Sequence, residues 1–534
     1  MKKAKLTLHP EYKTGEISPR LFGTFLEPIG SMVNGSMFNP KHPSADELGL
    51  RSDFYTALKE AGMPCVRLPG GNFVSGWEWK DSIGPKEQRK VALDMAWRQF
   101  IPNDVGHDEY LRWAERTGAE AMYTINLGTG TLRDAVDLVE YTNFEGGSYW
   151  SDLRAQNGHK APYGVKTWYL GNEMDGPWQI ASYERDPKGY GVLAHEVSKA
   201  IKWTDPKAET VACVSSSPFL AHYPDWDRAV LEECYDTVDY ISLHHYHSAL
   251  PGDIKALMAG TMAYEDYIRT EIGLCDYIAS RNRVSKKMML SFDEYSASFR
   301  PGSGAKYGRC GRIPADNFCN FDPERKYIRH DPDDWSKRQF PWRVPEMISV
   351  LANMSVTLTL LRHADRVKIG CATSGINMLC ATDREHVWKG AAYYPMRQLI
   401  CHAKGVSLLP VVKCDTYDVP GYAVDDMNQY MGFENVPTVT AAAALNEEKG
   451  ELTVFVINAD EKEEQLLSMD LRGFEGLSLI EHLSMSSESQ DDRNTYEHPD
   501  QILPRPCPET KLDGGLAEAK LKPLSWNMLR FSVK

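Results

Sequence analysis

Short apolar runs alternate with helix-like stretches through the first two thirds of this 534-residue chain. Several runs are almost continuously apolar, which is typical of parallel strands that are buried on both faces. Helix-like stretches separate them, for example over 53–61, 108–117, 188–203 and 345–361. Eight strands alternating with helices predict an α/β fold, the (β/α)8 or TIM barrel. The eight runs are 20–27, 65–69, 121–127, 167–172, 210–215, 240–247, 288–294 and 366–371.

After about residue 385 the pattern changes to strand-like segments, such as ELTVFVIN and SWNMLRFSV, separated by Gly, Asn and Asp turns. This pattern predicts a C-terminal antiparallel β-sandwich, jelly-roll-like in type. The strand-like N-terminus over 3–10 precedes the first barrel strand, and we expect it to complete the sandwich. The predicted domains are a catalytic barrel over 17–384 and a sandwich made of 1–16 plus 385–534.

Composition excludes several classes of protein. The formal net charge of −14 argues against a nucleic-acid partner, because proteins that bind nucleic acids usually present a basic face. No run approaches the ~18 apolar residues of a membrane span, and no apolar stretch follows the N-terminal lysines as in a signal peptide. The 11 cysteines form no CxxC pair. We therefore expect a cytoplasmic protein with reduced thiols.

Two of the predicted strands end in carboxylates. Glu173 follows the run that ends at 172, and Glu294 ends the run that begins at 288. The carboxyl ends of barrel strands build the active site, so the two groups could face each other as the acid/base and the nucleophile of a glycosidase. Taken alone, Glu173 fits better as a residue that caps the next helix or pairs with an arginine. Asp293 should point to the opposite side of its strand from Glu294.

Two further segments carry candidate binding residues. In the segment Arg-Leu-Pro-Gly-Gly-Asn, Arg67 could keep a carboxylate ionised and Asn72 could bind a hydroxyl, although a plain strand-end turn is as good a reading. In His-His-Tyr-His at 244–247, alternation places His245 and His247 together in packing positions and His244 beside Tyr246 on the other face. No neighbouring Cys, Asp or Glu spacing supports a metal site there. Tryptophans that could stack on sugar rings lie near these motifs, namely Trp77, Trp79, Trp97, Trp178, Trp335 and Trp342.

Taken together, these motifs resemble glycoside hydrolase family 51, the α-L-arabinofuranosidases. The resemblance runs over nearly the whole chain and includes LFGTFLE at 21–27, RLPGGNF at 67–73, INLGTG at 125–130 and GNEMDGPWQ at 171–179. It continues through LHHY at 243–246, FDE at 292–294 and YYP at 393–395. The order and spacing of these motifs are more specific than any one of them.

The resemblance implies a retaining exo-glycosidase that releases terminal α-L-arabinofuranosyl groups from plant-derived oligosaccharides. It implies Glu173 as the acid/base, Glu294 as the nucleophile and Asn172 as a contact to the sugar 2-hydroxyl. It further implies that Glu27, Asn72 and Tyr246 bind the sugar. It also implies a cytoplasmic homo-oligomer, commonly a hexamer, without a metal or other cofactor.

The chain departs from the family pattern at three positions. Pro28 replaces the usual His after the first-strand Glu, Leu68 replaces an aromatic residue, and Ser374 stands near the position of a sugar-binding Gln. A shorter side chain at 374 enlarges the subsite or removes a hydrogen bond. Alternatives therefore stay open: a β-D-galactofuranosidase, a β-xylosidase or an endo-β-glucanase with the same mechanism, or a non-catalytic carbohydrate-binding protein. The long polar loop over 299–342 could be a lid.

Overall fold

The computed structural model describes residues 1–300, 326–329, 344–373, 379–423, 429–430 and 432–534. Eight parallel strands close into a barrel in the order in which they occur along the chain. All eight predicted runs contribute a strand, so the predicted barrel is confirmed. The barrel strands are β3 (Gly23–Phe25), β4 (Cys65–Leu68), β7 (Glu120–Ile125), β8 (Thr167–Leu170), β9 (Glu209–Cys213), β10 (Tyr240–Ala249), β11 (Met289–Phe299) and β13 (Val367–Ala372).

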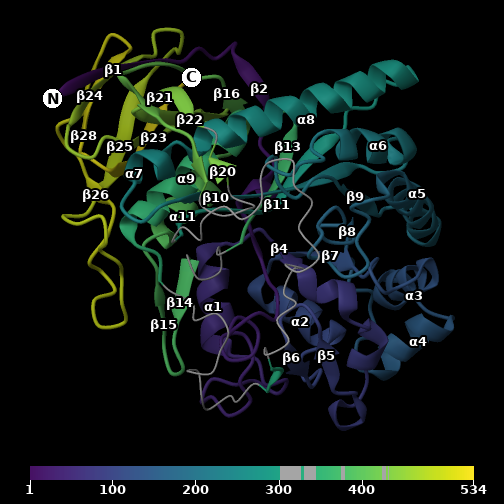
Figure 1. Cartoon of the computed structure of the whole chain (residues 1–534). Coiled ribbons are helices and arrows are strands. Elements are labelled where there is room, and N and C mark those ends of the chain that lie inside the picture. The colour runs from purple at the N-terminus through teal and green to yellow at the C-terminus, as the bar shows by residue number, and fades with distance from the viewer. Residues whose placement is uncertain (301–325, 330–343, 374–378, 424–428, 431) are drawn as a thin grey trace.

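Helices follow each barrel strand and form the outer layer (Figure 1). Local sequence sets several of their ends: Thr131 and Asp134 form a reciprocal capping box at the start of α3, and Gly62 closes α1 in the left-handed conformation. The helices are α1 (Ser52–Ala61), α2 (His107–Thr117), α3 (Leu132–Asn143), α4 (Tyr149–Gln156), α5 (Pro187–Thr204), α6 (Asp225–Cys234), α7 (Ile254–Met258), α8 (Gly260–Asn282), α9 (Met347–Arg362) and α11 (Tyr393–His402).

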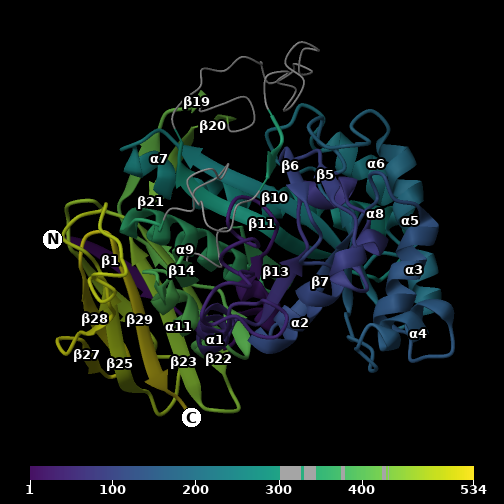
Figure 2. The same cartoon turned by 90° about the horizontal axis from the view of Figure 1, so that it is seen from below.

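Two further sheets stack into a sandwich beside the barrel (Figure 2). A separate apolar core lies between them, built from alternate residues of strands such as β23 and β28. The first sheet is β17 (Val411–Lys413), β1 (Lys2–Thr7), β24 (Gln465–Asp470), β28 (Leu516–Leu521) and β27 (Lys511–Asp513). The second is β2 (Lys13–Glu16), β16 (Val406–Leu408), β22 (Val439–Asn446), β23 (Glu451–Asn458), β29 (Ser525–Ser532), β25 (Ser478–Met485) and β26 (Arg505–Pro506).

The N-terminal strand completes the sandwich as predicted, with one difference in direction. β1 pairs antiparallel with β17 but parallel with β24. Both neighbours lie far away in the sequence, so no hairpin turn forces β1 to run antiparallel to them. The remaining pairs of both sheets are antiparallel.

The barrel and the sandwich share helix α9, whose residues from Met347 to Leu361 are all buried. This helix packs against β11 and β13 on one side and against β22 on the other. Helix α11 packs into the barrel core through Met396 and Leu399, although it lies beyond the predicted boundary at 384. The domain limits themselves stay a prediction.

Small hairpins decorate the barrel. β5 (Ala92–Asp94) and β6 (Gln99–Ile101) form an antiparallel pair. A third strand, β12 (Ile328–Arg329), pairs parallel with β6. The other short strands are β14 (Cys380–Thr382), β15 (Val387–Lys389), β18 (Thr416–Val419), β19 (Tyr422–Ala423), β20 (Gln429–Tyr430) and β21 (Phe433–Pro437). Most of the predicted lid over 299–342 lies outside the described residues. None of the described helices has the length and apolar character of a membrane span.

Candidate active site

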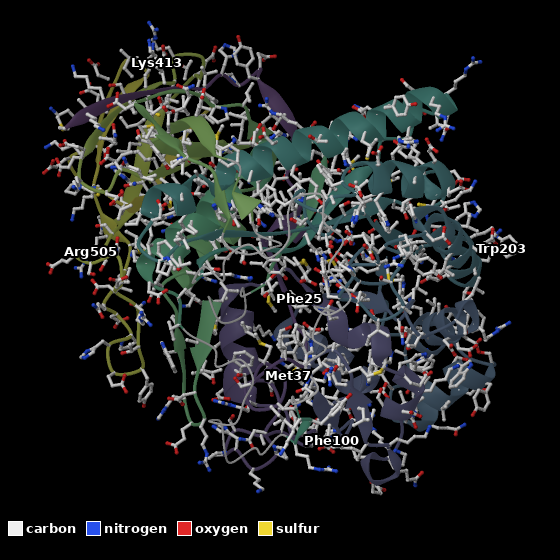
Figure 3. The ribbon with its side chains drawn as sticks, in the orientation of Figure 1. Phe25, Met37, Phe100, Trp203, Lys413 and Arg505 are labelled. Carbon is white, nitrogen blue, oxygen red and sulfur yellow. The ribbon has the colours of Figure 1, made fainter. Side chains whose placement is uncertain are left out.

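Seven of the eight predicted site residues lie in barrel strands or directly after them, with Glu294 and Tyr246 inside strands that continue to Phe299 and Ala249. The carboxyl ends of the strands meet at one mouth of the barrel. Phe25, the last residue of β3, is labelled near the middle of the molecule in Figure 3. Six of the seven residues share one network of hydrogen bonds and ion pairs, in which His244 provides the link to Glu173, whereas Glu27 bonds the backbone N–H of Phe73. Ser374 lies outside the described residues. The seven residues are Glu27, Arg67, Asn72, Asn172, Glu173, Tyr246 and Glu294.

Glu173 and Glu294 face each other across the mouth. One carboxyl oxygen of Glu173, one of Glu294 and a ring nitrogen of His244 all lie within 4.8 Å of one another. Glu173 is 9% exposed and Glu294 is 5% exposed, so both side chains are almost completely buried. The backbone of Glu173 has φ of +45°, which non-glycine residues rarely adopt and which is often found at functional sites.

Arg67 holds the nucleophile candidate. Its guanidinium donates to Glu294 at 2.6 Å and to Asn172 at 2.7 Å, and its Nε lies 3.0 Å from Asp293. The guanidinium is completely buried and stacks over the ring of Tyr169. Burial would raise the pKa of Asp293, but the charge of Arg67 lowers it. The charge-assisted hydrogen bond from the same guanidinium fixes the carboxyl group of Glu294 in place.

Asparagine side chains form the next part of the network. The Asn172 amide accepts from Arg67 and donates to Asn72 at 3.0 Å. Gln179 donates to the same Asn72 oxygen at 2.9 Å and to the backbone carbonyl of Asn172 at 2.8 Å. These bonds fix both asparagine side chains beside the acid/base candidate, where they can address sugar hydroxyls.

Tyr246 and Glu27 flank Glu294. The hydroxyl of Tyr246 donates to Glu294, and the hydroxyl of Thr373 lies 3.3 Å from that of Tyr246. Glu27 accepts from the backbone N–H of Phe73 and from the indole N–H of Trp97, both at 2.8 Å. Burial raises the pKa of Glu27 to about 8, and the charge of Glu294 adds to this shift.

His244 connects the two predicted catalytic carboxyl groups. Its Nδ1 lies 3.1 Å from Glu173, its Nε2 lies 3.1 Å from Asp293, and Nδ1 is 3.8 Å from Glu294. Burial would lower the pKa of His244, but the charges of Glu294 and Asp293 and its hydrogen bonds to Asp293 and Glu173 raise it to about 10. Burial also raises the pKa of Glu173. The two side chains therefore hold a proton between them, next to the nucleophile candidate.

The prediction for Asp293 is wrong. It lies completely buried on the inner side of the barrel, where it contacts Arg67, His244 and Ser242. The register of β11 shifts against both neighbouring strands near this residue. Such an irregularity breaks the simple alternation of side chains, so two consecutive acids reach the same side of the strand.

His245 and His247 lie in packing positions, as predicted. The ring of His245 packs against those of Phe219 and Tyr264, and His247 bonds the backbone carbonyl of Ala256 at 2.9 Å. Burial lowers the pKa of both rings.

Two of the predicted tryptophans contact site carboxyls through their indole N–H groups. Trp178 donates to Glu173 at 2.5 Å, and Trp97 donates to Glu27. Trp77 and Trp79 are core residues, while Trp335 and Trp342 lie outside the described residues. Sequence reasoning gave no role to His244 or Gln179. The alternation that pairs His244 with Tyr246 was a usable signal for His244, whereas nothing local marks Gln179.

Two departures from the family pattern lie next to the site. The backbone carbonyl of Pro28 accepts from Gln99, which also donates to Asp94 at 2.6 Å. Leu68 is completely buried in the barrel core. Leu68 therefore contributes to core packing, and Pro28 contributes a backbone hydrogen-bond acceptor.

Glu173, His244 and Glu294 are the residues that could hold a metal ion within the described part of the chain. Each already has a hydrogen-bond partner in the site, and the charge of Arg67 lies against Glu294. Proton sharing and ion pairing account for this grouping.

Comparisons with known proteins agree with this geometry. Residues 57–269 match the model of the α-L-arabinofuranosidase 1 domain, and residues 328–525 match that of the α-L-arabinofuranosidase C-terminal domain. The chain is 36% identical over 537 residues to the intracellular exo-α-(1→5)-L-arabinofuranosidase 1 of Bacillus subtilis, covering 99% of each chain. It is 30% identical to an exo-α-(1→6)-L-arabinofuranosidase of Bifidobacterium longum, covering 98% of this chain and 97% of the relative.

Solved structures give the same result. A family 51 α-L-arabinofuranosidase from Bifidobacterium longum superimposes with a TM-score of 0.83 at 28% identity, covering 99% of this chain and 100% of that one. The arabinose complex of an α-L-arabinofuranosidase from Thermotoga maritima gives 0.82 at 25% identity, with 99% of both chains covered. With full-length identity above a third and both domain models matched, the chain belongs to the family 51 α-L-arabinofuranosidases.

Proposed function

We propose that this protein is a retaining exo-α-L-arabinofuranosidase in which Glu294 is the nucleophile and Glu173 the acid/base. The observation that carries the mechanism is the separation of the two carboxyl groups, whose closest oxygens lie within 4.8 Å. Retaining glycosidases hold their carboxyl groups about 5–5.5 Å apart, whereas inverting enzymes leave about 6.5–9.5 Å for a water molecule. The separation supports a double displacement.

In the first step Glu294 attacks the anomeric carbon while the proton held by Glu173 and His244 passes to the leaving oxygen. Arg67 and Tyr246 orient the attacking carboxylate through their hydrogen bonds. The bond from the anomeric carbon to the leaving oxygen breaks, and a glycosyl ester forms on Glu294.

In the second step Glu173 accepts a proton from water, and that water attacks the anomeric carbon of the ester. Glu294 leaves as a carboxylate, which Arg67 stabilises. Asn72, Asn172 and Glu27 line the same mouth, and we assign them to the sugar hydroxyls. We also propose that Ser374 contacts the sugar.

The relatives indicate the substrate class. Several that cover almost the whole chain are named exo-α-(1→5)-L-arabinofuranosidases and are called intracellular. We therefore propose terminal α-(1→5)-linked arabinofuranosyl groups of small oligosaccharides as the substrate and the cytoplasm as the location. A homo-oligomer, with a hexamer as the expected form, is a further proposal that light scattering on the purified protein tests.

Hydrolysis of a panel of 4-nitrophenyl glycosides tests the activity. The panel holds the α-L-arabinofuranoside, β-D-galactofuranoside, β-D-xylopyranoside and β-D-glucopyranoside, with arabino-oligosaccharides beside them. We expect turnover of the arabinofuranoside and its loss in Glu294→Ala. Glu265→Gln, a change on the outer helix α8, is the matched control and should retain activity. Turnover of another glycoside in place of the arabinofuranoside would refute the proposed specificity, and unchanged turnover in Glu294→Ala would refute the assigned nucleophile.

A further inference from the structure

Glu27 is a buried carboxyl group without a cation. It is 4% exposed, and within the described part of the chain it forms no ion pair. The guanidinium of Arg67, in the same site, is shared between Glu294 and Asp293. An ionised carboxylate is costly to bury without a charged partner, and such a group takes up a proton instead.

The charges around Glu27 increase this cost. Glu294 and Asp94 both act on it as negative charges, and both raise its pKa. The opposing groups are two neutral donors, the backbone N–H of Phe73 and the indole of Trp97. Burial is the largest cause of the shift, and the pKa of about 8 lies above neutral pH.

The two oxygens of Glu27 have different surroundings. Both neutral donors bond to Oε1, which therefore acts as an acceptor. Oε2 lies toward the nucleophile: a Cβ atom built on Gly71 would lie 3.1 Å from Oε2 and 3.1 Å from Oε1 of Glu294. Oε2 is thus the oxygen that can carry a proton, and it borders the space in which a sugar bound to Glu294 would lie.

We propose that Glu27 is a neutral carboxylic acid in the working enzyme and donates a hydrogen bond from Oε2 to an oxygen of the bound furanose. This inference rests on the proposed function and specifies the protonation state and bond direction of one sugar contact. A neutral Glu27 adds no further negative charge beside Glu294. Loss of the proton would place a second anion beside the nucleophile and turn a donor into an acceptor.

Glutamine at position 27 is the test variant because it mimics the neutral acid. Its amide oxygen can accept from Phe73 and Trp97, while its NH2 group donates from the position of Oε2. We expect Glu27→Gln to keep kcat/KM for an aryl α-L-arabinofuranoside within about 10-fold of the wild type at pH 7. Glu27→Ala should lose about 100-fold or more, because a site built to bond a hydroxyl is left incomplete.

Infrared difference spectroscopy gives a second readout that does not depend on turnover. The wild type should show the C=O stretch of a protonated carboxylic acid at pH 7 that is missing in Glu27→Gln and disappears in the wild type as the pH rises through about 8. Glu271→Gln is the matched control, because Glu271 on α8 is likewise a buried carboxyl group but lies outside the mouth. It should remove a different band and leave kcat/KM unchanged.

Two results would overturn the proposal: Glu27→Gln as inactive as Glu27→Ala in a folded protein, or identical carboxylic-acid bands in the wild type and Glu27→Gln. The first would mean that the sugar needs an anionic acceptor at this position. Melting temperatures of all variants establish that they are folded. If the wild type hydrolysed no arabinofuranoside, the proposed function would fail, while the infrared comparison would still decide the protonation state.

Discussion

Replacing Glu173 by alanine should separate the two chemical steps of the reaction. Glu173 supplies the acid in the first step and the base in the second, so its loss affects each step according to its need for proton transfer. A sugar leaving group needs protonation, whereas an acidic phenol needs little. The variant should therefore discriminate between substrates that the wild type treats alike.

The size of each effect follows from the role of the group. General acid catalysis contributes about 10²–10⁴-fold, so kcat/KM for an arabino-oligosaccharide should fall by that factor. For an aryl glycoside with an acidic phenol, kcat/KM reports the first step and should stay within about 10-fold. Its kcat should fall by about 10²-fold or more, because the second step lacks its base, and KM should fall with it.

The structure also sets a cost in stability. Alanine leaves the indole N–H of Trp178 and Nδ1 of His244 without their partner. An unsatisfied buried group costs about 1–3 kcal/mol, which urea unfolding can resolve. Glu173→Gln keeps the volume of the side chain and serves as the matched control.

Steady-state kinetics on both substrate types, with azide added, provide the assay. Azide can replace water in the second step without needing a base, so it should restore kcat for the aryl glycoside in Glu173→Ala and yield a glycosyl azide of retained configuration. Equal slowing of both substrate types without azide rescue would refute the acid/base assignment.

Three further changes test the surrounding structure. Arg67→Met removes the cation between two buried carboxylates and should cost about 3–5 kcal/mol in urea unfolding; a loss below about 1 kcal/mol would contradict the buried ion pairs. Gly71→Ala adds a methyl group 3.1 Å from an oxygen of Glu294 and should reduce kcat/KM at least about 10-fold with unchanged circular dichroism; full activity would show that this space is not used. Burial raises the pKa of Glu265, but His363 and two arginines lower it to about 2. This carboxylate therefore stabilises the fold above its unfolded value of about 4.5, and the contribution is lost as the pH falls through 2. Glu265→Gln should flatten the acid side of the melting-temperature curve, and an unchanged curve would exclude the pairing.

The local sequence pattern was sufficient to predict the eight barrel strands. A strand that is buried on both faces must be apolar along most of its length, and strands such as β4, β8 and β9 bury almost all of their residues. The same rule predicted Glu173 and Glu294 at strand ends and therefore close together; the two carboxyl groups do meet, although β11 continues past Glu294 to Phe299. The departure of Asp293 had no local signal, since the irregularity in β11 is set by its pairing with two neighbouring strands.

The sequence by itself determined the barrel, the sandwich with its N-terminal strand and the carboxylates at the mouth, because these follow from periodicity and from the ends of strands. Only the tertiary structure decided the charge state of each group. His244 becomes a shared proton carrier because three carboxyl groups from two other strand ends surround it. Among the described residues Glu27 has no cationic partner, and Arg67 on the neighbouring strand is bound to Glu294 and Asp293. Distances between residues far apart in the chain set these protonation states, and no local pattern encodes them.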